Sequence, residues 1–187
     1  MKKIQVEITG ETPLLMNSPK GMLEPKDAIR KTTKVYDPEI EAEKVAYRTD
    51  KGELYVPNTA IKGSIINASA WKKAGKNALR PLIAAGIRIP QSELLLGTKK
   101  YEIDLRTVVI QRARVVKARP MIKDWKLNFE ILYNDQLIAD PDIIKEVLTE
   151  AGERVGILDF RPQKLGEFGT FTVTKFKVEK WNPNKNF

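Results

Sequence analysis

Hydrophobic and polar residues alternate in three segments of the chain, and a period of two predicts strands. In the first segment Ile4, Val6 and Ile8 share one face, while lysine, glutamine and glutamate occupy the other. The last segment is rich in threonine, valine and phenylalanine, which favour strands. The three predicted strands are residues 2–9, 125–133 and 170–178.

Helical spacing or capping residues mark three further segments. Asp37-Pro38 followed by three glutamates predicts a short helix over 38–46. Residues 58–71 combine a cap residue, Asn58, with apolar residues at helical spacing. Asp140-Pro141 opens a third helix, which ends near residue 152 or 156.

The remaining segments predict strands and hairpins. Residues 47–56 read as two short strands around an Asp-x-Gly turn. Residues 81–97 are apolar but contain Gly86 and Pro90, so short strands are expected there. Residues 101–122 are rich in β-branched side chains and predict a basic strand or hairpin.

The order of these elements predicts the fold class. Strand, helix, hairpin strands, helix and strand follow the β-α-β-β-α-β pattern, so we expect an α+β, ferredoxin-like (RRM-like) domain with inserted hairpins and a basic loop. The single domain is expected to span residues 1–181, with insertions at about 17–57 and 76–105 and a flexible tail at 182–187.

The charge balance indicates a polyanionic partner. The 187 residues include 33 Lys and Arg against 24 Asp and Glu, a formal net charge of +9, which attracts nucleic acid. No apolar run is long enough to cross a membrane, and the N-terminus does not read as a signal peptide, so a cytoplasmic protein is expected. Abundant Lys and Glu without cysteine suit an intracellular protein from a hot environment.

Two residue types are missing from the sequence, and this narrows its chemistry. Without cysteine or histidine there is no thiolate nucleophile, zinc-thiolate site or histidine base, so we expect no cofactor, no metal and no catalysis. Glu102 and Asp104 form a carboxylate pair that could hold Mg²⁺ in a nuclease, but salt bridges to neighbouring arginines explain them equally well.

The densest charge feature lies between residues 106 and 126. In an extended strand Arg112 and Arg114 would project together, as would Lys117 and Arg119, and such pairs can follow successive phosphates. The alternative is a solvated edge whose charges prevent aggregation. The predicted nucleic-acid contacts here are Arg106, Arg112, Arg114, Lys117, Arg119 and Lys123, joined by Lys31 and Lys34 from a basic loop at 17–34.

A glycine-containing loop at 156–169 is the second candidate. Its glycines would allow close backbone approach to a ligand, its cations could meet phosphates, and Phe160 or Phe168 could stack on a base. The two aromatic residues could equally be buried anchors of a tight loop. The predicted contacts are Arg161, Lys164, Gly166, Phe168 and Gly169.

Two motifs give the chain a family resemblance. The stretch from Val56 to Ile65, with Lys62-Gly63 inside it, resembles the motif that opens the first helix in the RAMP superfamily of CRISPR-associated proteins, and the loop at 156–169 lies where that family has a glycine-rich loop. The resemblance also extends to RAMP-like proteins of phages. It implies that Lys62, Arg161, Lys164, Gly166 and Gly169 contact a nucleic-acid backbone and that residues 20–34 form a thumb-like element.

Together these observations predict a non-catalytic protein that binds single-stranded DNA or RNA with little sequence preference. Several copies could coat one strand, and a viral origin would fit such a binder. The chain lacks the catalytic histidine of RNA-processing RAMP proteins. The alternatives are a RAMP-type subunit of a CRISPR ribonucleoprotein, a structural or assembly protein, and, less favoured, a metal-dependent nuclease.

Overall fold

The computed structural model describes residues 1–22, 36–75, 77–110 and 112–179. Lys31 and Lys34, together with most of the predicted basic loop and the predicted tail, lie outside the described residues. No helix among the described residues is both long enough and apolar enough to cross a membrane.

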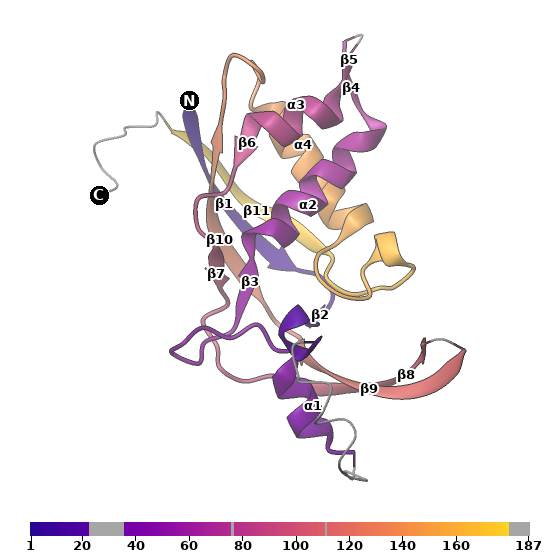
Figure 1. Cartoon of the computed structure of the whole chain (residues 1–187). Helices are drawn as coiled ribbons and strands as arrows, with labels where there is room; N and C mark the ends of the chain where they lie inside the picture. Colours follow the sequence, from indigo (N-terminus) through magenta and orange to yellow (C-terminus); the bar gives the residue numbers. More distant parts are fainter. Residues whose placement is uncertain (23–35, 76, 111, 180–187) are drawn as a thin grey trace.

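A four-stranded antiparallel sheet forms the centre of the molecule (Figure 1). Its order is β11-β1-β10-β6, with bounds Phe171–Glu179, Lys2–Gly10, Lys126–Tyr133 and Ile87–Arg88. The three alternating segments are therefore strands, as their period of two predicted. Ile4 and Ile131 are partners in the ladder and are fully buried on the inner face.

Three helices cover the inner face of this sheet: α2 (Asn58–Ala68), α3 (Leu79–Gly86) and α4 (Asp142–Glu150). Buried residues of α2 and α4, such as Ile61, Ile65 and Val147, complete the core with the strand residues beneath them. A short π-helical turn, Ala151–Val155, extends α4. The chain is thus an α+β protein in which helices lie on one face of an antiparallel sheet.

Helix α3 corrects one prediction. Residues 81–97 were expected to form only short strands because Gly86 and a proline interrupt them, yet the segment contains most of a helix. Pro81 lies in the first turn, where backbone N–H groups have no partner within the helix, and Gly86 is the last helical residue, so neither breaks it. The range predicted as an insertion also contains β6, an edge strand of the main sheet.

The helix starts agree with the predicted caps in two cases of three. Asp37 accepts backbone hydrogen bonds at the start of α1 (Pro38–Lys44), and Asp140 accepts one from the N–H of Asp142. Asn58 does not cap α2, because its side chain donates to the carbonyl of Ile89 at 2.9 Å.

A second sheet carries the basic segment away from the core. Its order is β2-β9-β8, with bounds Leu14–Leu15, Ala113–Ile122 and Glu102–Ile110. Strands β8 and β9 form a long curved hairpin at the lower edge of the molecule, and α1 packs against its base (Figure 1). The basic strand or hairpin predicted over 101–122 is therefore a hairpin, and among the described residues it pairs with β2 and with no strand of the four-stranded sheet.

Two smaller ladders complete the described fold. Strands β3 (Tyr55–Pro57) and β7 (Glu93–Leu95) pair with each other, as do β4 (Lys73–Ala74) and β5 (Asn77–Ala78). The hairpin predicted over 47–56 has its turn, but its strands share only one isolated bridge, between Arg48 and Leu54, because β3 takes β7 as its ladder partner.

Candidate nucleic-acid interface

The hairpin presents three predicted cations without a carboxylate partner among the described residues: Arg112, Arg114 and Lys117. Arg112 lies in the turn with a left-handed φ of 68°, so it does not project in line with Arg114 as a strand pair would. Lys117 lies directly opposite Arg106 in the ladder. Asp104 compensates the charge of Arg106 at 2.8 Å, so Lys117 is the cation of this pair that is left for an anion.

Arg119 is buried, so its prediction as an exposed phosphate contact is wrong. Its guanidinium is 3.3 Å from the carboxylate of Asp104 and 2.8 Å from that of Asp159, and only 4% of the residue is accessible. This ion pair joins the hairpin to the loop at 156–169. Periodicity along β9 could not reveal the burial, because Asp159 arrives from a distant part of the chain.

Two other predicted cations of the hairpin are also paired. Arg106 is 2.8 Å from Asp104 and lies over the rings of Phe168 and Phe160, at 4.8 and 5.8 Å from their centroids. Lys123 forms an exposed pair with Glu102 at 2.8 Å, which contributes little to stability. Both acids of the suspected metal pair therefore have cationic partners: Asp104 pairs with arginines, as the salt-bridge alternative predicted, whereas the partner of Glu102 is Lys123. Among the described residues no group of three potential ligand side chains is placed to hold a metal ion.

The loop at 156–169 is held by its own hydrogen bonds rather than open to a ligand. A Cβ on Gly166 would lie 1.8 Å from the carbonyl oxygen of Phe160, and one on Gly169 would lie 2.1 Å from that of Ile157. These glycines are thus required by contacts within the loop. Phe168 is 8% accessible and its ring packs on Phe160 with centroids 5.9 Å apart, which fits the buried-anchor alternative.

The same loop leaves two cations available. Arg161 donates to the carbonyl of Leu158 at 2.8 Å and to Gln163 at 3.1 Å, but no carboxylate lies within salt-bridge distance among the described residues. Lys164 is exposed at the end of the short 3-10 turn Pro162–Lys164. Leu158, Phe160 and Leu165 all have positive φ, a conformation that costs energy and concentrates at functional sites.

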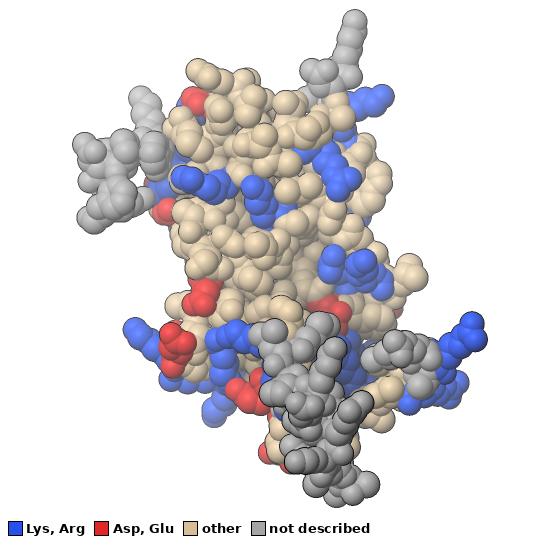
Figure 2. Space-filling model, viewed as in Figure 1, with Lys and Arg blue, Asp and Glu red and all other residues tan. Residues whose placement is uncertain are grey.

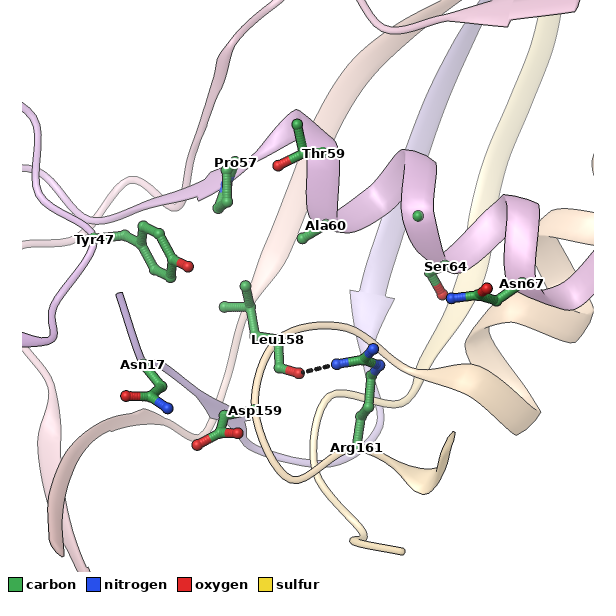
Figure 3. A pocket seen from close by; sticks show the side chains of 11 residues that line it. Asn17, Tyr47, Pro57, Thr59, Ala60, Ser64, Asn67, Leu158, Asp159 and Arg161 are labelled. Atoms are coloured by element: carbon green, nitrogen blue, oxygen red, sulfur yellow. Dashed lines mark hydrogen bonds between the residues drawn. The ribbon is translucent and has the colours of Figure 1, made fainter. Parts of the chain in front are cut away.

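A cleft of about 360 Å³ separates this loop from α2 (Figure 3). Arg161 and Ser64 lie toward one end, and Tyr47, Asn17 and Asp159 toward the other. A hydrogen bond joins α2 to the start of the loop, because the hydroxyl of Ser64 donates to the carbonyl of Gly156 at 2.8 Å. The full lining is Asn17, Tyr47, Pro57, Thr59, Ala60, Gly63, Ser64, Asn67, Leu158, Asp159 and Arg161.

Gly63 keeps the helix wall of this cleft free of a side chain. It lies inside α2 without a positive φ, and a Cβ at this position would meet no atom within 4 Å. A glycine inside a helix costs roughly 0.5–1 kcal/mol relative to alanine. Since nothing in the packing requires it, the glycine is explained by the space it leaves. Lys62 precedes it and has no carboxylate partner among the described residues.

The polar groups at the Tyr47 end of the cleft have unused hydrogen-bonding capacity. The hydroxyl of Tyr47, the side-chain amide of Asn17 and Oδ1 of Asp159 have no hydrogen-bond partner among the described residues. Burial raises the pKa of Tyr47, with smaller effects from Tyr55 and Asp159, so its hydroxyl keeps its proton at neutral pH.

The outer face of the main sheet has a different character. Lys3 pairs with Glu130 at 2.9 Å, and Glu7 pairs with Lys126 at 3.3 Å and accepts a hydrogen bond from Thr174. Charges that neutralise each other across strands leave little attraction for a polyanion. The surface around the hairpin and the loop is therefore the stronger candidate; Figure 2 shows many Lys and Arg side chains at the lower end of the molecule, with several Asp and Glu side chains among them.

Six predicted cations thus have no carboxylate partner among the described residues, three others are paired, and Lys31 and Lys34 lie outside the described part of the chain. The six are Lys62, Arg112, Arg114, Lys117, Arg161 and Lys164. The sequence-based predictions missed Asn17, Tyr47 and Gly63. Only Gly63 had a signal in the sequence, as a glycine interrupting a well-formed helical pattern.

The fold is similar to that of a chain in a solved CRISPR complex. That structure is described as the Type III-B Cmr-beta bound to cognate target RNA; the TM-score is 0.60 at 15% identity, and the match covers 96% of this chain and 61% of the other. The chain therefore spans about three fifths of the length of the chain it matches. At this identity the likeness establishes a shared fold.

A second structure, described as a CRISPR RNA-guided surveillance complex, matches with a TM-score of 0.30 at 9% identity over 80% of this chain and 58% of the other. Comparison of the sequence with protein-family models and with curated proteins found no match.

Proposed function

We propose that this protein binds single-stranded nucleic acid, preferably RNA, without cleaving it. The observation that carries the proposal is the set of six cations on the hairpin, on α2 and on the loop around the cleft that have no carboxylate partner in the described part of the chain. Phosphates of a single strand would pass Arg112 and Arg114 near the tip of the hairpin, then Lys117 on the other face of β9, and continue past Lys164 and Arg161. RNA is preferred because the solved structure that shares this fold is bound to target RNA.

In this proposal the main sheet and its helices form a β-α-β-β-α-β core of ferredoxin-like type. The order β11-β1-β10-β6, with every neighbouring pair antiparallel and α2 and α4 as the connecting helices, supports it. The protein would then act as a RAMP-type subunit of a ribonucleoprotein or as a free-standing binder of similar build.

Self-association along the strand is part of the same proposal. The hairpin exposes Leu105, Val109, Val115 and Val116, each more than two fifths accessible. Exposed apolar side chains on a projecting arm favour contact with another protein surface. A purely structural or assembly protein would use the same residues, but its size in solution would depend on concentration and not on added nucleic acid.

Charge reversal on the hairpin tests the proposal. Arg112→Glu with Arg114→Glu should weaken binding of a labelled single strand similarly for every sequence and flatten its salt dependence. The control is Arg88→Glu with Lys175→Glu, which changes the net charge equally at exposed positions on the two edge strands of the main sheet. Equal losses in both double variants would mean that only overall charge matters, and unchanged affinity in the hairpin variant would overturn the assignment.

A further inference from the structure

The cleft at α2 has opposite chemistry at its two ends. Arg161 supplies a cation at one end, whereas Asp159 places a carboxylate at the other, beside Asn17 and Tyr47 (Figure 3). A phosphate would be attracted to the first end and repelled by the second. The acidic end therefore needs a different partner, one that donates hydrogen bonds.

The carboxylate of Asp159 is fixed in position but only half used. Oδ2 accepts from Arg119 at 2.8 Å, and the backbone N–H of Asp159 donates to the carbonyl of Leu15 at 3.0 Å. Oδ1 has no partner among the described residues, and 31% of the side chain is accessible. An ionised carboxylate only accepts hydrogen bonds, so the free oxygen selects for N–H or O–H groups.

The neighbouring groups suit a flat polar ring. Tyr47 stands edge-on to Tyr55, with ring centroids 5.6 Å apart, which holds its ring in place. Pro57 and Leu158 add apolar surface, and the amide of Asn17 can both donate and accept. A volume of about 360 Å³ lies near the lower end of the range for small-molecule pockets, roughly 300–1,000 Å³.

We propose that this cleft receives one base of the bound strand and selects a base whose edge carries adjacent N–H donors, guanine being the best match. This inference rests on the proposed function, since the base arrives as part of a single strand. Oδ1 of Asp159 would accept from one of the two donors, the ring N–H or the exocyclic amino group, and the second lone pair of Oδ2 from the other, while Asn17 or Tyr47 would donate to the carbonyl oxygen. Uracil offers one N–H between two carbonyl oxygens, which a carboxylate disfavours.

The arrangement adds a local preference to a strand held mainly through its phosphates. Proteins that read single-stranded RNA commonly hydrogen-bond the edges of bases that are splayed out of the stack. Arg161 at the opposite end is placed to meet a phosphate of the same nucleotide. A strand with one well-placed guanine would then bind in a fixed register, whereas a uridine-only strand would slide.

The experiment compares a uridine-only oligoribonucleotide with the same strand carrying one central guanosine, adenosine or cytidine, by fluorescence anisotropy. The guanosine strand should bind the wild-type protein roughly tenfold more tightly than the uridine strand, within the range for one bidentate base contact. Asp159→Asn should abolish that ratio, and its affinity for the uridine strand should rise because a negative charge is removed.

Asp104→Asn is the matched control, because Asp104 is the other carboxylate on Arg119 but does not line the cleft. It should retain the guanosine preference. Loss of the preference in both variants would assign the effect to the Arg119 ion pair and overturn the inference. Equal wild-type affinity for all four strands would also overturn it while leaving the proposed function standing, and failure to bind any strand would overturn both.

Discussion

Replacing Gly63 should change stability and binding in opposite directions. Alanine at a helix-interior position is favoured over glycine by roughly 0.5–1 kcal/mol. The new methyl group would meet no atom within 4 Å, so the structure adds neither a clash nor a packing gain to that figure. Gly63→Ala should therefore stabilise the protein by about 0.5–1 kcal/mol, or about 1–4 °C in melting temperature for a chain of this size.

Binding should respond to the size of the new side chain. Leucine is almost as good a helix former as alanine but reaches further into the cleft. Gly63→Leu should weaken single-strand binding by about tenfold, the equivalent of one lost contact of about 1.4 kcal/mol. Urea denaturation measures the stability, and fluorescence anisotropy with a labelled oligoribonucleotide measures the affinity.

Gly52→Ala provides the matched control. Gly52 also has nothing within 4 Å of a built Cβ, but its φ is +80°, and a left-handed conformation costs a non-glycine residue about 1–2 kcal/mol. Alanine should therefore destabilise the protein there. If Gly63→Ala also destabilises, the description of α2 is wrong; if Gly63→Leu is stable and binds with full affinity, the strand does not enter this cleft.

Two further substitutions test the ion pairs around the hairpin. Arg119→Met should lower the free energy of unfolding by about 3 kcal/mol. This is the lower end of the range for breaking a buried ion pair, because Asp104 would still be paired with Arg106 at 2.8 Å. An unchanged urea midpoint would contradict the burial of this ion pair. Burial and the hydrogen bond to Glu43 raise the pKa of Tyr101 to about 12. The contribution of the protonated Tyr101 to the free energy of unfolding is therefore complete below the ordinary pKa of 10.0 and is lost as pH rises through about 12. Tyr101→Phe should reduce the tyrosinate absorbance that appears near pH 12, to which Tyr47, Tyr55 and Tyr133 with their raised pKa values also contribute, and should weaken the loss of stability above pH 10; a titration curve equal to that of the wild type would contradict this.

Strand and helix positions were predictable where local signals agreed. The alternation in β1, β10 and β11 and the caps Asp37 and Asp140 are properties of short segments, and each element forms where expected. Helix α3 was missed because Pro81 and Gly86 count as helix breakers only in a helix interior, and here they occupy its first turn and its last residue. The separation of the hairpin from the main sheet depends on pairing between distant strands, which no local pattern encodes.

The candidate site was predictable only in its charge. The sequence identifies the basic hairpin, but it cannot distinguish the exposed Arg114 from the buried Arg119, five residues apart in one strand, because Asp159 buries the second from across the fold. The glycines of the loop were read as space for a ligand, whereas Gly166 and Gly169 accommodate the loop's own backbone. The cleft joins Asn17, Tyr47, α2 and the loop, which only the tertiary fold brings together.

The most direct test of nucleic-acid binding is a salt titration of anisotropy with labelled single-stranded RNA, single-stranded DNA and duplex DNA, with and without Mg²⁺. If most of the six cations that have no carboxylate partner among the described residues meet phosphates, the logarithm of the binding constant should fall with the logarithm of salt with a slope of about −3 to −4, at roughly 0.7 per phosphate. Both single strands should remain intact, and RNA should bind more tightly than the duplex. Salt-independent binding, cleavage of the strand in Mg²⁺, or no binding at low salt would contradict a non-catalytic protein that holds a single strand through its phosphates.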